Sequence, residues 1–185
     1  MTQRVDPAIR AKLEAFKSLF LKWNKSINLS AARTLADIDE HLRDSLHVIP
    51  HLAPATRIID VGSGGGFPVV IAAIAAPDIQ FTSLEPVHKK HAFLRTAARE
   101  LGLANLEAFA ARVEDHPVHD YDAATSRATF DLPDWIRTGL TLVRPGGRVL
   151  GFEATERNDL GVPFDRHPYD LAGKRRAIIV VRKPD

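Results

Sequence analysis

The segment Arg57–Pro68, with the sequence RIIDVGSGGGFP, restricts the fold more than any other part of the chain. Its first residues are apolar and β-branched, which favours a strand. Glycine at positions 62, 64 and 66 permits the positive φ angles of a sharp turn, and Pro68 suits the first turn of a helix. The segment therefore predicts a strand, a turn with accessible backbone N–H groups, and a helix. For the glycines alone, a tight turn without a ligand is the alternative.

The chain beyond this turn alternates short apolar runs with helical patterns, which is typical of successive βα units and a mainly parallel sheet. Strands are expected at residues 57–61, 80–84, 106–110, 123–126, 148–152 and 177–181, and helices at 70–76, 89–101 and 132–143. The segment 144–147 has the composition of a turn and 158–168 that of a loop, whereas the run after Lys174 predicts a closing strand.

The residues before the turn have a helical pattern instead. Apolar side chains recur at spacings of three and four from Ile9 to Trp23, and a second helix is expected at residues 37–51. With 185 residues, the chain is long enough for one core of useful size. The sequence therefore predicts a single α/β domain over 1–185, with a helical extension at 1–55 and a βα core at 56–185.

Composition excludes several classes of protein. The chain has no cysteine, so it has no disulfide, thiolate metal site or cysteine nucleophile. Its eight histidines are scattered, and we expect no metal site. No apolar run is long enough to span a membrane. Basic residues interrupt the segment Met1–Lys17, which therefore does not resemble a secretory signal. A cytoplasmic location is expected.

Charge is unevenly distributed along the chain. The net charge is +2, but residues 1–33 carry +5, residues 34–173 carry −7 and residues 174–185 carry +4. Basic ends on an acidic body favour an anionic partner such as nucleic acid, although solvated helix faces have the same composition. The candidates for phosphate contacts are Lys22, Lys25, Arg33, Lys174, Arg175 and Arg176.

The spacing of the glycines distinguishes between nucleotide ligands. A dinucleotide fingerprint needs glycine at the first, third and sixth positions, and the sixth position from Gly62 is Phe67. A phosphate-binding loop needs lysine followed by serine or threonine, and this turn has no lysine. Both kinds of phosphate site are therefore disfavoured.

Two acids accompany the turn. Asp60 precedes it, and Glu85 ends the next predicted strand, 23 residues after Gly62. A carboxylate in that place can accept hydrogen bonds from both hydroxyls of a ribose. The combination favours a nucleoside cofactor without phosphate, of which S-adenosyl-L-methionine is the commonest, with its adenine beside residues 111–114. Alternatively, Asp60 only supports the turn and Glu85 only begins a helix.

Six blocks of residues resemble one family in their order along the chain. They are residues 23–31 (WNKSINLSA), 41–46 (HLRDSL), 60–68 (DVGSGGGFP), 89–94 (KKHAFL), 111–114 (ARVE) and 126–128 (SRA). Over residues 20–183 the chain resembles the RsmG (GidB) family, which methylates guanine N7 in bacterial 16S ribosomal RNA. The glycine turn is shared by many methyltransferases, whereas the first two blocks are specific to this family.

The resemblance implies a Rossmann-like, class I S-adenosylmethionine-dependent methyltransferase fold. It also implies contacts with the cofactor. Together with the glycine turn and Glu85, which the residues themselves indicated, the predicted cofactor-binding residues are Gly62, Gly64, Phe67, Glu85, Val113, Glu114 and Arg127. The chain departs from the family pattern at Glu40, where a basic residue is usual, and near Glu153, where a lysine is common. It also departs at Val69, a position that glycine often occupies. The two acids bear on individual RNA contacts rather than on the cofactor site.

Guanine N7 has a free lone pair and no proton, so its methylation needs alignment of the reactants rather than a general base. We therefore expect no acid or base catalyst. His41, Asp44 and Ser45 are candidates for organising the acceptor pocket, or for a network that joins the N-terminal helices to the sheet. Arg127 is expected near the methyl-donating end of the cofactor site. We expect a carboxylate to pair with it, either the carboxylate of the cofactor or that of Asp60.

Two other functions are compatible with the sequence. One is a methyltransferase with a protein or small molecule as acceptor, since a fold does not determine its substrate. The other is a noncatalytic RNA-binding protein on the same fold. The basic ends argue against the first, and the intact glycine turn with Glu85 and Arg127 argues against the second. The expected partner is 16S ribosomal RNA or the small subunit, and the default oligomeric state is a monomer.

Overall fold

Two helices precede the first strand in the computed structural model, which describes residues 6–185. Helix α1 (Pro7–Ile27) begins at Asp6, whose side chain accepts a hydrogen bond from the backbone N–H of Ala8 at 2.8 Å. It ends at Asn28, in the left-handed conformation. The segment Met1–Lys17, which was predicted not to be a secretory signal, includes residues 1–5, and these lie outside the described residues.

Helix α2 (Leu35–Leu46) is shorter than the helix predicted at 37–51. It starts at a capping box formed by Thr34 and Asp37, which satisfies the first backbone N–H groups. It ends four residues before Pro50, and a short 3₁₀ helix, η1 (Ile49–His51), follows. Pro50 has no N–H to donate to the Leu46 carbonyl, so the α-helical hydrogen-bond ladder cannot continue through it.

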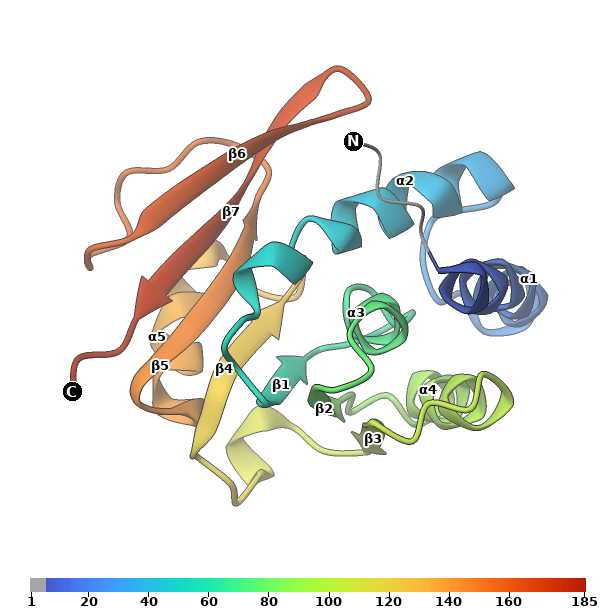
Figure 1. The fold of residues 1–185 in the computed structure, drawn as a ribbon, viewed down its shortest axis with the longest axis horizontal. Helices are drawn as coiled ribbons and strands as arrows, with labels where there is room; N and C mark the ends of the chain where they lie inside the picture. The colour runs from blue at the N-terminus through green and yellow to red at the C-terminus, as the bar shows by residue number, and fades with distance from the viewer. Residues whose placement is uncertain (1–5) are drawn as a thin grey trace.

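Among the described residues, seven strands form one mixed sheet in the order β3-β2-β1-β4-β5-β7-β6 (Figure 1). The first five are parallel, whereas β7 pairs antiparallel with both β5 and β6. The strands are β1 (Arg57–Val61), β2 (Gln80–Leu84), β3 (Leu106–Phe109), β4 (Tyr121–Ser126), β5 (Val143–Glu153), β6 (Asp165–Leu171) and β7 (Lys174–Arg182). The α/β class and the mainly parallel sheet are confirmed.

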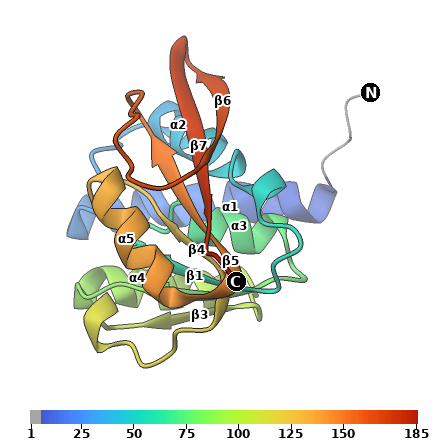
Figure 2. The ribbon, with the colours of Figure 1, turned by 90° about the vertical axis from the view of Figure 1, so that its left-hand side faces the viewer.

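The helices cover both faces of the sheet. Ile58 of β1 packs in the cluster that includes α1, α2, α3 (Val69–Ala75) and α4 (His88–Glu100). Its neighbour Ile59 packs in a second cluster with α5 (Leu132–Leu142) on the opposite face (Figure 2). Successive strand side chains point to opposite faces, so a strand buried on both sides is apolar throughout. In residues 6–185, no helix is long and apolar enough to cross a membrane.

Strand β6 was not predicted. Its first four residues fall in the predicted loop 158–168, because alternating polar side chains and a proline hide the strand pattern. As an edge strand it needs only one paired side, supplied by β7. Strand β5 also starts earlier than predicted: its pairing with β4 shifts register around the glycine-rich turn 144–147, so that turn is part of the strand.

Four phenylalanines join the N-terminal helices to the glycine turn. Phe67, directly after the glycines, lies with its ring centroid 5.3 Å from those of both Phe16 and Phe20 of α1. Phe93 of α4 lies 6.2 Å from Phe16 and 6.0 Å from Phe20. The N-terminal helices and the βα core therefore share one hydrophobic cluster.

This cluster predicts unequal effects of two Phe→Ala substitutions. Phe16 is 0% exposed, whereas Phe109 at the end of β3 is 38% exposed. Phe16→Ala is expected to lower the free energy of unfolding by about 3–5 kcal/mol because it leaves a cavity. The control Phe109→Ala is expected to lower it by less than about 1 kcal/mol. Urea unfolding measures both, and equal losses would contradict the assigned role of the cluster.

Candidate functional site

The glycine turn lies at the carboxyl end of β1, where β2 and β4 also end. Gly62, Gly64 and Gly66 have backbone φ angles of 72°, 52° and 87°, which residues other than glycine rarely adopt. The turn is fixed to β2 because the Gly62 N–H donates to the carbonyl oxygen of Leu84 at 2.9 Å. A Cβ atom on Gly64 would meet only the Gly62 carbonyl, at 3.8 Å, so a ligand has room to approach the backbone there.

Glu85 follows β2 directly and is 4% exposed. One carboxylate oxygen accepts the backbone N–H of Gly64 and the other accepts that of Val87, each at 2.8 Å. Glu85 therefore holds the glycine turn and also accepts the backbone N–H of the residue just before α4, although it does not cap that helix. Each of its oxygens has a second lone pair, which leaves acceptors for further hydrogen bonds at the turn.

Asp60 supports the turn from inside the core. It is 1% exposed, and its carboxylate accepts hydrogen bonds from the hydroxyls of Ser63 at 2.6 Å and Thr125 at 2.7 Å. Burial raises the pKa of Asp60 to about 6, against the lowering effect of these two hydroxyls and of the Arg127 charge. Asp60 is therefore a structural support of the turn and not the ion-pair partner of Arg127.

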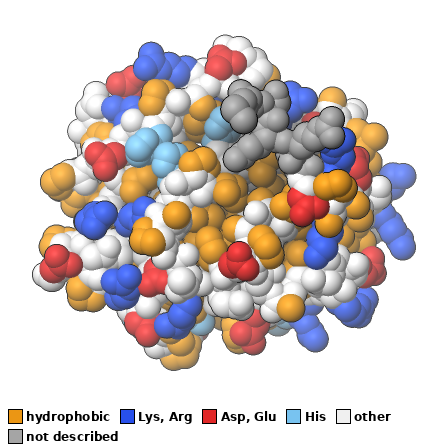
Figure 3. Space-filling model, viewed as in Figure 1, with side chains coloured by type: hydrophobic (Ala, Val, Ile, Leu, Met, Phe, Trp, Pro, Cys, Tyr) orange, Lys and Arg blue, Asp and Glu red, His pale blue; other side chains and the backbone are white. Residues whose placement is uncertain are grey.

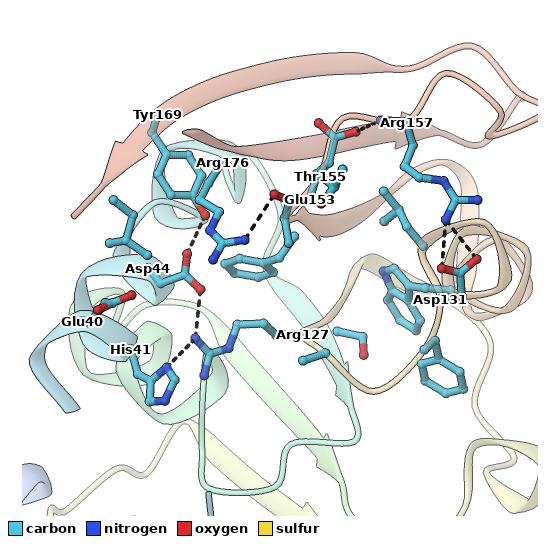
Figure 4. A pocket seen from close by; sticks show the side chains of 18 residues that line it. Glu40, His41, Asp44, Arg127, Asp131, Glu153, Thr155, Arg157, Tyr169 and Arg176 are labelled. Atoms are coloured by element: carbon cyan, nitrogen blue, oxygen red, sulfur yellow. Dashed lines mark hydrogen bonds and ion pairs between the residues drawn. The ribbon is translucent and has the colours of Figure 1, made fainter. Parts of the chain in front are cut away.

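Arg127 follows β4 and pairs with a carboxylate that is neither of the two expected partners. Its guanidinium donates to Asp44 of α2 at 2.9 Å, and His41 Nδ1 lies 3.4 Å away (Figure 4). It also lies over the ring of Phe67, 5.1 Å from the centroid. Asp60 is enclosed beneath the turn by hydroxyls, whereas Asp44 faces Arg127 from the N-terminal helices. Of the two expected partners, Asp60 is therefore wrong, and the carboxylate of the cofactor stays a prediction.

Tyr169 of β6 completes this group, and the sequence reasoning missed it. Its hydroxyl donates to the second oxygen of Asp44 at 2.6 Å. Burial and the neighbouring Asp44 raise the pKa of Tyr169. Burial and the Arg127 charge lower the pKa of His41, so its neutral ring can accept a hydrogen bond. No local motif indicates Tyr169, because the contact joins residues 125 positions apart.

A cavity of about 520 Å³ opens beside Arg127, at the carboxyl ends of β4 and β5 (Figure 4). Of the three residues expected there, His41 and Asp44 line it. Ser45 does not, because its hydroxyl donates to the His41 carbonyl within α2 and its side chain is buried. The cavity is further lined by Glu40, Phe130, Asp131, Trp135, Phe152, Glu153, Arg157, Tyr169 and Arg176.

Glu153, one of the acids that depart from the family pattern, is committed to an internal ion pair. It is 5% exposed, and its carboxylate accepts two hydrogen bonds from Arg166 of β6, at 2.9 and 3.0 Å. A third, from the backbone N–H of Arg157, also measures 2.9 Å. Arg157 in turn pairs with Asp131 at 3.0 Å, so these contacts hold one wall of the cavity.

The remaining predicted cofactor residues are Phe67, Val113 and Glu114. Phe67 is buried in the aromatic cluster. Val113 and Glu114 belong to the short 3₁₀ helix η2 (Val113–Asp115), where Val113 is half-buried and Glu114 is exposed. Thr129 was not predicted. Its hydroxyl donates to the Gly62 carbonyl at 3.1 Å, and a Cβ atom on Gly62 would lie 2.3 Å from it.

The basic candidates do not form a single cluster. Lys174 and Arg175 are exposed at the start of β7, on a hairpin that projects beyond the sheet (Figure 2). Arg176 turns into the cavity instead and donates to the Ala154 carbonyl at 3.2 Å. Arg33 donates to the Asn28 side chain and the Ser30 carbonyl, which ties the α1–α2 connection together.

Lys22 and Lys25 are exposed on α1. On the face shown in Figure 3, basic side chains lie mainly around the periphery and hydrophobic ones nearer the centre.

These residues fit S-adenosyl-L-methionine better than a phosphate-bearing nucleotide. The turn leaves room for a ligand at Gly64, and a buried carboxylate, Glu85, stands at the next strand end. The turn itself carries no lysine for a phosphate. The carboxyl end of a parallel sheet, where the strand order reverses between β1 and β4, is also the usual ligand position in such folds.

A family model described as rRNA small subunit methyltransferase G matches residues 9–162. The chain belongs to this family. It is 43% identical over 200 residues to ribosomal RNA small subunit methyltransferase G of Aromatoleum aromaticum, covering 96% of this chain and 92% of the relative. The protein of that name from Wolinella succinogenes is 35% identical over 172 residues, covering 89% of each chain. The chain is thus an rRNA methyltransferase that uses S-adenosyl-L-methionine.

Solved structures show the same fold at low sequence identity. The S-adenosylmethionine-dependent methyltransferase SibL matches with a TM-score of 0.68 and 16% identity, over 99% of this chain and 71% of that chain. The O-methyltransferase TomG from Streptomyces achromogenes, solved in complex with S-adenosylmethionine, matches with a TM-score of 0.61 and 16% identity, over 100% and 93%. These likenesses confirm the class I methyltransferase fold.

The buried carboxyl of Asp60 predicts a pH dependence of stability. Its pKa of about 6 in the folded state exceeds the ordinary value of 3.8, so the folded state binds the proton more tightly. The free energy of unfolding should therefore fall, by roughly 3 kcal/mol for this group, as pH rises from about 4 to above 6. Asp60→Asn, which stays neutral, should remove this part of the slope.

Urea unfolding of the wild type and the variant at several pH values between 4 and 7.5 measures this difference. The exposed Asp78→Asn serves as the control and should keep the wild-type slope. Parallel curves for the wild type and Asp60→Asn would contradict the assignment.

Proposed function

We propose that the chain transfers the methyl group of S-adenosyl-L-methionine to N7 of one guanine in 16S ribosomal RNA. The observation that carries the proposal is the position of the cavity. It shares Arg127 and Ala128 with the loop that packs on the glycine turn, so an acceptor in the cavity would adjoin the cofactor site. Its 520 Å³ volume is in the range of pockets that take small molecules, and so has room for one base.

In this proposal, the chain binds and aligns the reactants and needs no general base. The cofactor supplies a methyl group already activated on a sulfonium. Glu85 would hold the ribose hydroxyls, Val113 and Glu114 would flank the adenine, and the turn would hold the amino-acid end. Guanine N7 has no proton to remove, so holding it in line and excluding water would provide the rate enhancement.

The acceptor side would be formed by residues of several elements. Phe130 and Phe152, which line the cavity, offer half-buried rings against which a base could pack. His41 and Asp44 would organise the pocket through Arg127. Lys174 and Arg175 on the projecting hairpin, with Lys22 and Lys25 on α1, would contact phosphates. We further propose that the enzyme acts as a monomer in the cytoplasm, on 16S RNA or the small subunit.

Transfer of labelled methyl groups tests the reaction. Purified protein, labelled S-adenosyl-L-methionine and either 16S RNA or small subunits from a strain lacking the protein are combined, and the labelled base is mapped. Label at N7 of a single guanine is the expected result. Glu85→Ala should abolish both cofactor binding and label, because it removes the acceptor at the end of β2.

Two other results would each redirect the assignment. Cofactor binding without labelled RNA would favour a protein or small-molecule acceptor. Absence of cofactor binding would favour the noncatalytic RNA-binding alternative. Comparing deproteinised RNA with intact subunits shows which of the two is the substrate.

The hairpin predicts a salt-dependent contribution to RNA binding. Replacing Lys174 and Arg175 together by Glu should weaken binding and lower the slope of log affinity against log salt by about 1–2, because fewer counterions are released. The matched control replaces Arg95 and Arg99, exposed on α4, which lies far from the hairpin (Figure 1). Filter binding at several salt concentrations measures both, and an unchanged slope in the hairpin variant would refute the contact.

A further inference from the structure

A carboxylate from the N-terminal helices is held between Arg127 and a tyrosine from the far edge of the sheet. Asp44 accepts Arg127 through one oxygen at 2.9 Å and the Tyr169 hydroxyl through the other at 2.6 Å (Figure 4). The side chains of Arg127 and Asp44 are each 14% exposed, so solvent screens the pair only weakly. Three elements distant in sequence, α2, β6 and the end of β4, thus converge on one charge pair.

No third charged side chain forms an ion pair with Arg127 or Asp44 within residues 6–185. Within residues 6–185, Asp44 provides the single ion-pair contact of Arg127. The other polar neighbour, His41, is kept neutral by burial and by the guanidinium. The Tyr169 hydroxyl stays protonated because its pKa is raised. Arg127 and Asp44 therefore cancel each other's charge, and the tyrosine fixes the orientation of the carboxylate.

We infer that Asp44, oriented by Tyr169, offsets the charge of Arg127 toward the cofactor's sulfonium and thereby sets the preference for S-adenosyl-L-methionine over its uncharged thioether product. The inference rests on the proposed function, because it requires Arg127 to face the methyl-donating end. An uncompensated guanidinium would repel a sulfonium but leave a thioether unaffected. Asp44 and Tyr169 are thus positioning residues, since both act through Arg127.

The inference predicts opposite effects of two substitutions on one ratio. Isothermal titration calorimetry gives the Kd of S-adenosyl-L-methionine and of S-adenosyl-L-homocysteine for each variant. Asp44→Asn should shift the ratio of the two affinities about tenfold toward the thioether. Arg127→Gln should shift it toward the sulfonium, even if both affinities fall. Asp44→Glu keeps the negative charge and should retain most of the wild-type ratio.

A purely structural role would weaken both ligands alike, so equal losses in Asp44→Asn would overturn the inference. A shift in the same direction for Asp44→Asn and Arg127→Gln would also overturn it. Asp120→Asn is the matched control, because Asp120 forms an exposed ion pair with Arg57 at 3.1 Å, at the amino end of β1 and therefore at the end of the strand away from the glycine turn. If Asp44→Asn fails to fold, the sign of the Arg127→Gln shift still decides the question.

The chain's two tyrosines allow a separate test of Tyr169. Tyr169→Phe removes the hydroxyl that fixes Asp44 and should shift the ratio about two- to threefold toward the thioether. Tyr121→Phe removes a comparable buried hydroxyl, which lies 2.9 Å from His116 Nε2, and should leave the ratio unchanged. Equal ratios in the two variants would overturn the role of Tyr169.

Loss of binding to both ligands in the wild type would instead refute the proposed cofactor site itself.

Discussion

The packing of aromatic rings against the glycine turn is the contact on which the rest of the site depends. Phe67 belongs to the turn, and Phe16 and Phe20 come from the first helix. A Cβ atom on Gly65 would lie 2.7 Å from the Phe20 ring, so the turn must be glycine on this side also. Because the same rings stabilise the fold and hold the turn, the N-terminal helices are part of the site.

Buried carboxylates organise the site around this turn, and each has a defined set of donors. Asp60 accepts two hydroxyls beneath it, and Glu85 accepts two backbone N–H groups beside it. Asp44 and Glu153 pair with arginines at the cavity. A buried carboxylate without donors would be strongly destabilising, so these pairings determine which acids remain available to a ligand. Glu85 retains spare acceptor capacity at the open side of the turn.

The edge of the sheet has a larger role than its place at the end of the chain suggests. Strand β6 supplies Tyr169 to Asp44 and Arg166 to Glu153, and so connects the N-terminal helix to the cavity wall. In the part of the chain that the structure describes, it pairs with β7 alone, and its alternating polar residues resemble a loop in the sequence. A strand of this kind is recognisable only when its partner is known, because its hydrogen bonds come from the neighbouring strand.

The sequence by itself determined the order of the βα units, the glycine turn and the place of Glu85 at the end of the next strand. Short-range patterns of apolar residues, glycine and acidic residues are sufficient for this, because they specify local backbone geometry. It also indicated the family, through blocks such as residues 41–46. Only the tertiary structure decided that Arg127 pairs with Asp44 rather than Asp60, that Ser45 faces its own helix, and that Tyr169 belongs to the site. The contacts of Asp44 with Arg127 and with Tyr169 join residues 83 and 125 positions apart, and no periodicity within a single element encodes such pairings.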